Sequence, residues 1–194
     1  MLIYGTGGHA KVIAGGLKDS GEKVVAYFDD DVTKLRSDHT FLYDNYLYRE
    51  EPLLVAVGDN LTRRTLVDKI SHSFGSLIHP TACVPEGVWV GVGSVVLQRT
   101  ILQYGAYVGR HVIINTGASV DHDCVIEDFV HLAPGVILCG GVSIGENTLI
   151  GAGTIVTPNV SIGKNCLVAA GSIISTSLPD NTIVRKCSGR ASLN

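Results

Sequence analysis

Every sixth residue from Ile78 to Ile174 is isoleucine, leucine or valine. The residue four positions after each of these is small or β-branched almost throughout. Neither the 3.6-residue period of a helix nor the two-residue period of a strand produces this pattern, whereas a six-residue repeat marks a parallel β-helix. Three such units make one triangular turn of about 18 residues. Residues 18 apart should therefore stack in adjacent turns, with the aliphatic side chains filling the interior.

The register of the repeat predicts where each histidine lies. His122 is the third residue of its unit and is expected at a corner, with Gly140 one turn above it, about one strand spacing or ~4.8 Å away. His131 is the last residue of its unit and is expected to point outward from a flat face. His72 and His111 are expected to be solvated surface histidines.

The composition changes near residue 77 and divides the chain into residues 1–75, the repeat at 76–180 and a tail at 181–194. The net charge is −3 without a basic stripe, so nucleic acid is not an expected partner. No signal peptide and no apolar run near 18 residues is present, so we expect a cytoplasmic protein outside membranes. The cysteine spacings fit no zinc motif and no metal is expected; Cys124 and Cys166 fall on small inward positions of the repeat.

The first 72 residues alternate between strand-like and helix-like segments, which predicts a small parallel sheet. Asn60 is the expected N-cap of the second helix, with Arg63 and Arg64 exposed on it. The predicted strands are 1–4, 23–28 and 53–57, the predicted helices are 10–18 and 61–71, and 31–52 is expected to be a loop with a short strand or helix.

The turn Gly5-Thr6-Gly7-Gly8-His9 joins the first strand to the first helix. Such a turn can present backbone N–H groups to a phosphate at the helix N-terminus. Asp29 ends the next strand, where an acidic residue binds a ribose hydroxyl in dinucleotide folds. The loop is not Gly-x-Gly-x-x-Gly and the segment is too short for two mononucleotide halves, which disfavours NAD. Half of that fold could hold one nucleotide; a purely structural glycine turn is the alternative.

Four motifs precede the hexapeptides: Gly-x-Gly-Gly-His-Ala-Lys-Val, Phe-Asp-Asp, Val-Gly-Asp-Asn-x-x-Arg-Arg and Ile-His-Pro-Thr-Ala. Together with the repeat, they resemble the sialic-acid O-acetyltransferase/PglD-type sugar N-acetyltransferase family over nearly the whole chain. The resemblance implies an α/β, Rossmann-like mononucleotide-binding domain followed by a left-handed parallel β-helix. It also implies a homotrimer with active sites between subunits.

The resemblance carries roles onto residues of this chain. His122, in Asn-Thr-x-x-x-Val-x-His-Asp-Cys, takes the place of the general base, a role that suits imidazole because its pKa is near neutrality. Asp123 takes the place of its acidic neighbour, and the Gly140 N–H one turn above is the expected oxyanion donor. The expected ligand contacts are Gly7, Gly8, His9, Asp29, Asp30, Gly58 and Asn115 for the nucleotide sugar, and His131, Ala152 and Ala170 for acetyl-CoA.

The expected activity is acetyl-CoA-dependent N-acetylation of a nucleotide-linked amino sugar, with a UDP-linked 4-amino-4,6-dideoxy sugar preferred. Transfer is direct and needs no covalent enzyme intermediate. GDP- or dTDP-linked sugars and O-acetylation of a sialic acid or another sugar are alternatives. A non-catalytic coil is disfavoured because His122 and the Asn115 motif are intact. Beyond the coil, Val184 to Ala191 keeps only the basic character of the family's turn.

Overall fold

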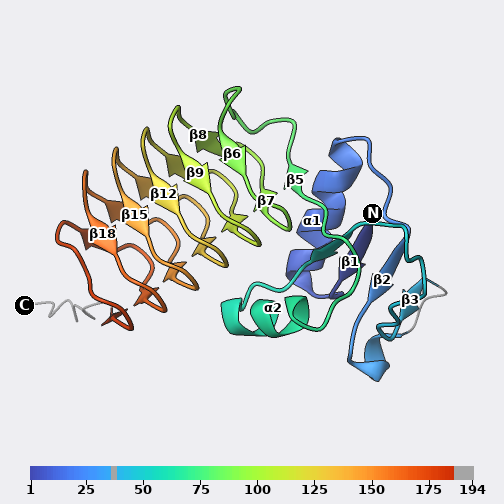
Figure 1. The fold of residues 1–194 in the computed structure, drawn as a ribbon. Helices are drawn as coiled ribbons and strands as arrows, with labels where there is room; N and C mark the ends of the chain where they lie inside the picture. The colour runs from blue at the N-terminus through green and yellow to red at the C-terminus, as the bar shows by residue number, and fades with distance from the viewer. Residues whose placement is uncertain (36–38, 186–194) are drawn as a thin grey trace, which may run out of the picture.

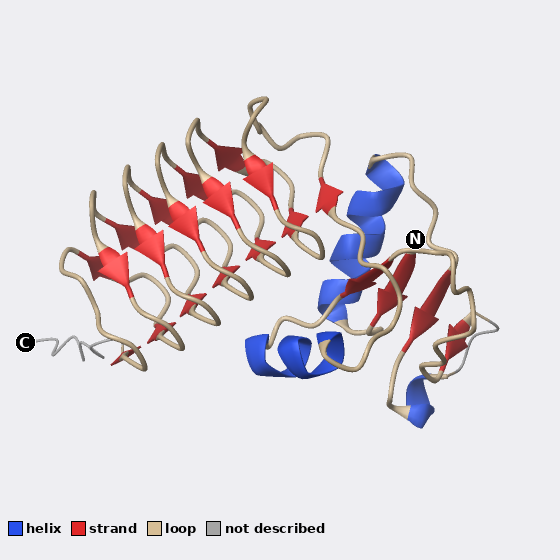
Figure 2. Cartoon of the chain, in the orientation of Figure 1, coloured by secondary structure: helices blue, strands red, loops and turns tan. Residues whose placement is uncertain are grey.

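The computed structural model describes residues 1–35 and 39–185 and contains two parts, an N-terminal α/β domain and a three-sided coil that extends from it (Figures 1 and 2). The predictions made for residues 186–194 concern a segment outside the described residues. Within the described ranges, no helix has the length and apolar character needed to cross a bilayer. The fold class predicted from the sequence, a Rossmann-like domain followed by a left-handed β-helix, is confirmed.

The N-terminal domain is a four-stranded parallel sheet in the order β3-β2-β1-β4. Alternate side chains of β1 face opposite ways, as a strand requires: Ile3 packs toward α1, and Leu2 packs toward α2 with Phe28. The elements of this domain are β1 (Leu2–Tyr4), α1 (Gly8–Asp19), β2 (Ala26–Phe28), the 3-10 turn η1 (Val32–Lys34), β3 (Thr40–Phe41), β4 (Leu53–Val55) and α2 (Asn60–Val67).

The coil has three parallel sheets, one on each side. Face 1 comprises β5 (Leu77–Ile78), β7 (Val95–Val96), β10 (Ile113–Ile114), β13 (His131–Leu132), β16 (Leu149–Ile150), β19 (Leu167–Val168) and β21 (Ile183–Val184). Face 2 comprises β8 (Ile101–Leu102), β11 (Ser119–Val120), β14 (Ile137–Leu138), β17 (Ile155–Val156) and β20 (Ile173–Ile174). Face 3 comprises β6 (Trp89–Val90), β9 (Tyr107–Val108), β12 (Val125–Ile126), β15 (Ser143–Ile144) and β18 (Ser161–Ile162).

The interior of the coil is filled by the six-residue aliphatic series and by the small residues two positions before each member. Cys124 and Cys166 are both buried there, as the register predicts. The 18-residue spacing holds through β20 and then shortens, because Leu167 pairs with Ile183. The last turn is therefore two residues shorter than the repeat predicts.

The outward side chains of face 1 join the two parts of the molecule. Leu77, Val95 and Ile113 are successive outward positions of this face, and all three are buried against α1. His131 is the next outward position along the same face. The stacking of the coil thus brings His131 to the border of the N-terminal domain.

The beginning of α2 differs from the sequence prediction. Asp59, not Asn60, is the N-cap, since its side chain accepts a hydrogen bond from the Thr62 N–H. Asn60 is turned inward, and its Nδ2 donates to the backbone oxygen of Asn147. Arg63 was expected to be exposed and is 1% exposed. The prediction failed because the helix has a second buried side, against the coil.

The expectation that His72 and His111 are solvated is also wrong, because both are buried. His72 packs on Phe28, and its ring nitrogens contact Tyr43 and the backbone oxygen of Leu47. His111 lies between Phe74 and Phe129, edge-on to the first and stacked on the second. His111 is a corner position of the coil that the junction with the N-terminal domain covers, whereas His72 is buried within the N-terminal domain itself.

Candidate functional site

A histidine, a carboxylate and a backbone amide meet at the coil edge between faces 2 and 3. His122 Nδ1 lies 2.8 Å from Asp123 Oδ2, and the ring sits directly beneath Gly140. A Cβ added to Gly140 would lie 2.6 Å from both Nε2 and Cε1 of His122. Among the described residues, none accepts a hydrogen bond from the Gly140 N–H. The edge therefore presents an imidazole and an unused amide donor side by side.

The carboxylates around His122 favour its protonated form. The hydrogen bond to Asp123, followed by the charge of Asp121, raises the pKa of His122 above its ordinary value. Asp121 Oδ1 also accepts a hydrogen bond from the His122 backbone N–H, which fixes the corner. Because Nδ1 faces Asp123, Nε2 is the nitrogen left for a substrate. An imidazole held in this way can take up a proton at Nε2.

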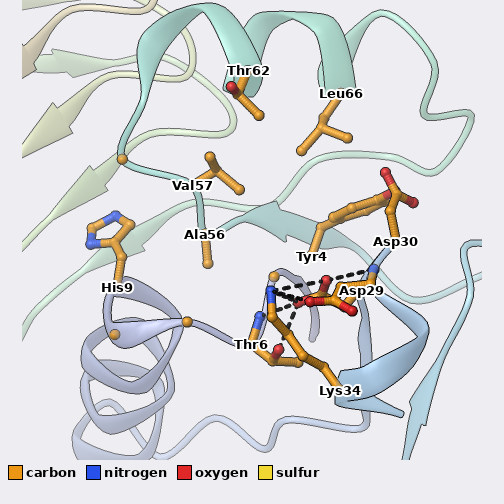
Figure 3. A pocket seen from close by; sticks show the side chains of 15 residues that line it. Tyr4, Thr6, His9, Asp29, Asp30, Lys34, Ala56, Val57, Thr62 and Leu66 are labelled. Carbon is orange, nitrogen blue, oxygen red and sulfur yellow. Dashed lines mark hydrogen bonds and ion pairs between the residues drawn. The ribbon is translucent and has the colours of Figure 1, made fainter.

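A pocket of about 470 Å³ lies at the carboxyl edge of the N-terminal sheet (Figure 3). The Gly5–Gly8 turn and the N-terminus of α1 form one wall, and Thr62 and Leu66 of α2 lie across from it. Gly7 and Gly8 have open space where a side chain would stand. Their backbone can thus approach a ligand closely at a helix N-terminus, where an anion is favoured.

Two neighbouring aspartates of this pocket have different surroundings. Asp29 accepts hydrogen bonds from Thr6, from the Asp31 N–H and from Lys34. Burial works to raise the pKa of Asp29, but these donors outweigh it and hold the pKa below its usual value. Asp29 therefore braces the loop with both of its oxygens.

Asp30 accepts one bond, from the Tyr4 hydroxyl at 2.5 Å. Burial first, and then Asp30, raises the pKa of Tyr4, so that Tyr4 keeps its proton and donates it. The second carboxylate oxygen of Asp30 accepts from none of the described residues. That oxygen remains available to a ligand in the pocket.

Two histidines lie at the end of the pocket nearest the coil. The rings of His9 and His131 are 6.4 Å apart. His131 Nδ1 lies 3.1 Å from the Gly58 oxygen and its Nε2 lies 3.3 Å from Asn115 Nδ2. His9 Nε2 is buried and has no hydrogen-bond partner among the described residues. Burial lowers the pKa of each histidine to about 4, so both are neutral at neutral pH.

A third feature is the coil edge between faces 1 and 2. Ala152 and Ala170 lie 18 residues apart on this edge and line an apolar hollow of about 710 Å³ together with Leu149, Leu167 and Ile183. The small side chains leave the backbone accessible along the coil axis. An extended, flexible ligand could lie along this edge.

The structure brings together the residues predicted for the nucleotide sugar, and it separates them from His122. Gly7, Gly8, His9, Asp29, Asp30 and Gly58 all line the pocket. Asn115 does not line it, and its side chain contacts His131, which lies beside Gly58. In a three-sided coil, the edge between faces 2 and 3 lies opposite face 1. Within one chain, His122 is therefore on the far side of the coil from His131 and the pocket.

Sequence reasoning missed several residues of the pocket. Tyr4, Thr6, Lys34 and Thr62 line it beside the predicted residues. Thr6 sits inside the glycine turn, and its position was a usable signal. Lys34 follows Asp29 by five residues, and a local 3-10 turn capped by Asp31 returns it to that carboxylate. Across residues 1–35 and 39–185, no group of three or more His, Cys, Asp or Glu side chains could hold a metal ion.

Comparison with known proteins connects both parts of the chain to one group. Residues 1–70 match the PglD N-terminal domain model, and residues 141–176 match the model of the bacterial transferase hexapeptide (six repeats). A crystal structure of a mutant of perosamine N-acetyltransferase from Caulobacter crescentus, in complex with CoA and GDP-perosamine, is similar to this chain and 38% identical in sequence. The match covers 94% of this chain and 91% of that one, with a TM-score of 0.88.

Two further relatives agree. The acetyltransferase domain of PglB from Neisseria gonorrhoeae, in complex with acetyl coenzyme A, is 32% identical, with 94% and 93% coverage and a TM-score of 0.83. GDP-perosamine N-acetyltransferase from Escherichia coli O157:H7 is 26% identical over 145 residues, which are 70% of this chain. That match spans 65% of the E. coli protein.

The hexapeptide coil and the similarity to N-acetyltransferases show an acyltransferase of the hexapeptide-repeat class. The sequence identity of 38% over 94% of the chain identifies the family within this class. The chain belongs to the sialic-acid O-acetyltransferase/PglD-type sugar N-acetyltransferase family.

Proposed function

We propose that this protein transfers the acetyl group of acetyl-CoA to the amino group of a nucleotide-linked sugar. The observation that carries the proposal is the coil edge, where His122 is paired with Asp123 beneath the unused amide of Gly140. The pocket at the glycine turn supports a nucleotide-linked acceptor. The perosamine N-acetyltransferase of C. crescentus, which binds CoA and GDP-perosamine, supports the same pairing of ligands.

In the proposed reaction, His122 Nε2 removes a proton from the sugar amine while the amine nitrogen attacks the thioester carbonyl carbon. The Gly140 N–H donates to the oxygen that becomes negative. The C–N bond forms and the C–S bond breaks, and the proton held by His122 passes to the departing thiolate of CoA. Asp123 keeps Nδ1 protonated and stabilises the imidazolium formed in between.

We assign the diphosphate to Gly7 and Gly8 at the N-terminus of α1. The sequence favoured UDP as the carrier, and that stays a prediction. Similarity to two GDP-perosamine enzymes favours GDP instead. Acetyl-CoA is assigned to the Ala152 and Ala170 edge and to His131.

We further propose that each active site is shared between two subunits of a homotrimer. His122 and the pocket lie on opposite sides of the coil in one chain, so one chain cannot bring them together. Face 2 carries the outward side chains of Ile101, Ile137 and Ile173, which are exposed in the single chain. Such an apolar row is suited to burial against a second copy.

Mixed trimers test the shared site directly. His122→Ala removes the base, and Gly7→Glu places a carboxylate where the diphosphate would bind, at a position with no atom within 4 Å of the new Cβ. Each variant alone should be inactive with acetyl-CoA and a GDP- or UDP-linked amino sugar. When the two variants are mixed in equal amounts and assemble at random, half of the pockets are intact, and half of these intact pockets face an intact His122. About a quarter of the wild-type number of active sites should therefore be restored. Mixed trimers without activity would refute the shared site.

The same assay tests the activity itself. We expect an amide product that resists hydroxylamine, whereas O-acetylation would give a hydroxylamine-labile ester. Thermal shifts with GDP, UDP, dTDP and CMP identify the nucleotide, because a ligand that binds the folded state raises the melting temperature. Stabilisation by UDP alone would reject GDP as the carrier. A wild-type enzyme that acetylates no nucleotide-linked amino sugar would reject the proposed function.

A further inference from the structure

Arg63 is a buried cation at the junction of the two parts of the molecule. It belongs to the Asp-Asn-x-x-Arg-Arg motif, for which the proposed chemistry has no use. It lies on α2 and is 1% exposed, and burial lowers its pKa to about 10, so it stays charged at neutral pH. Burying a charge is costly unless its hydrogen bonds are satisfied. The hydrogen bonds of Arg63 therefore show what the buried guanidinium does in the structure.

Every N–H of the Arg63 guanidinium has an acceptor, and none of the acceptors is a carboxylate. Nε donates to the His111 oxygen at 3.0 Å. Nη1 donates to the backbone oxygens of Val57 at 3.0 Å and Gly58 at 3.3 Å. Nη2 donates to Asn60 Oδ1 and to the Phe129 oxygen, both at 2.8 Å. A lysine has three donors on one nitrogen and cannot reproduce this planar fork.

On the coil side, α2 contacts the same corner of three successive turns. Arg63 binds the backbone oxygens of His111 and Phe129, and Asn60 binds that of Asn147 at 3.1 Å. These three corner residues are 18 apart, so their oxygens follow the coil axis at about one strand spacing, ~4.8 Å, per turn. Shifting α2 by one turn would remove two of these bonds or force new ones. Arg63 and Asn60 together thus fix the position of α2 along the coil axis.

On the other side, the same guanidinium holds the loop that closes the pocket. Val57 and Gly58 line the pocket. The Gly58 oxygen accepts from Arg63 Nη1 and also faces His131 Nδ1 at 3.1 Å. A carbonyl can only accept, so His131 must carry its proton on Nδ1. Its Nε2 then accepts from Asn115 Nδ2, whose partner oxygen is already bonded to the Thr116 N–H.

We infer that Arg63 is a positioning residue, which sets the nucleotide pocket at one height along the coil and holds His131 in its Nδ1-protonated form. The inference rests on the proposed function, because it explains how a sugar bound in the pocket of one chain is presented to the acetyl group. Arg63 touches neither substrate. Its effect is on geometry, and an error of about 1 Å in such placement can cost roughly 100-fold in rate.

The adjacent Arg64 provides a matched control. It also joins α2 to the coil, through an ion pair with Glu146 and a contact of its guanidinium 5.0 Å above the Phe129 ring. It is partly exposed, however, and it binds neither the pocket loop nor a corner oxygen. Arg64→Lys keeps the charge and should leave catalysis unchanged. Arg63→Lys keeps the charge as well but loses the fork.

The test compares Arg63→Lys with Arg64→Lys and the wild type. For Arg63→Lys we expect kcat per bound CoA to fall roughly 10- to 100-fold, with the Kd of the nucleotide and the KM of acetyl-CoA within a factor of about three. We also expect faster hydrogen–deuterium exchange in 57–60 and 129–131 than in Arg64→Lys. If Arg63→Lys does not fold, Asn60→Ala takes its place, since it removes only the bond to Asn147 and one acceptor of Arg63. For Asn60→Ala we expect a smaller fall in kcat per bound CoA and a smaller increase in exchange in the same segments.

The outcomes separate this inference from the proposed function. If Arg63→Lys only lowers the melting temperature and keeps wild-type kcat per bound CoA, Arg63 is structural and the inference is wrong. If exchange in 57–60 and 129–131 matches that of Arg64→Lys, the clamp is absent and the inference is also wrong. A wild-type enzyme without acetyltransferase activity would reject the function, while the exchange comparison would still test the clamp.

Discussion

At the coil edge, His122 contacts its neighbour Asp123 and lies beneath Gly140, one turn away. At the domain junction, His131 contacts Gly58, which is 73 residues earlier in the chain. The first histidine is exposed and its pKa is raised by carboxylates, whereas the second is partly buried and desolvation lowers its pKa to about 4. One coil therefore supplies two opposite environments for the same side chain.

The difference shows which contacts a repeat can encode. Local spacing and the 18-residue stack are enough to build the coil edge, which would exist without the N-terminal domain. The junction exists only because α1 and α2 cover the first turns of the coil. A change at the edge should therefore alter catalysis with little effect on folding, whereas a change at the junction should affect both.

The largest of the remaining effects is expected at the coil edge from Gly140→Ala. The added Cβ would stand 2.6 Å from Nε2 of His122, and the ring would have to move away from the amide. We expect kcat to fall roughly 100-fold, because base and oxyanion donor would no longer be aligned, with little change in melting temperature. Gly15→Ala, at an exposed helical position with nothing within 4 Å, is the control. Wild-type kcat in Gly140→Ala would mean that the two groups do not act together.

A smaller effect is expected from Asp123→Asn. The hydrogen bond to Asp123 is the main cause of the raised pKa of His122. A general base must be unprotonated, so wild-type activity should be lost as the pH falls through that raised pKa. Without the carboxylate the pKa of His122 drops, and the acid limb of the pH–kcat profile should move to lower pH while the plateau falls about 10-fold. An acid limb that does not move would remove Asp123 from this role.

The junction should be the pH-sensitive part of the fold. Burial lowers the pKa of His111 to about 4, whereas an unfolded histidine titrates near 6.5. The unfolded state therefore binds the proton first, and stability is complete above about pH 6.5 and is lost as the pH falls toward 4. At pH 5 the loss is about 2 kcal/mol for this group.

Comparison of His111→Asn with the wild type measures this contribution. The variant loses the packing between Phe74 and Phe129 and should be less stable at pH 7. Its free energy of unfolding should nevertheless change less between pH 7 and pH 5, by about the 2 kcal/mol assigned to His111. His39→Asn, at an exposed position, is the control. An equal pH dependence in His111→Asn and the wild type would show that the buried imidazole is not the sensor.

Much of the coil could be predicted from the sequence. The series from Ile78 to Ile174 gave the interior, the corner position of His122 and the stacking of Gly140, because each of these depends on spacing alone. The glycine turn pointed to the pocket for the same reason, since a strand, a tight turn and a helix are local features. The short last turn, where Leu167 pairs with Ile183, was missed because the repeat has already ended there.

Apart from His72, which is buried within the N-terminal domain, the misplaced polar residues lie where the two parts meet. Arg63, His72 and His111 were expected to be exposed because each is polar and their surroundings in the sequence carry no sign of burial. Asn60 was expected to cap α2 and instead binds Asn147. No periodic pattern records a contact between residues 87 apart, so no reading of the chain by itself could have found it.

The sequence by itself determined the coil, its three faces and the edge on which His122 lies, because a six-residue period leaves one solution for the register of every turn. Only the tertiary structure decided where the N-terminal domain sits on that coil. That choice depends on a few long-range hydrogen bonds, from Arg63 and Asn60 to corner oxygens and from His131 to Gly58. The position of the N-terminal domain also places His122 and the pocket on opposite sides of one chain. The proposed active site therefore needs a second chain.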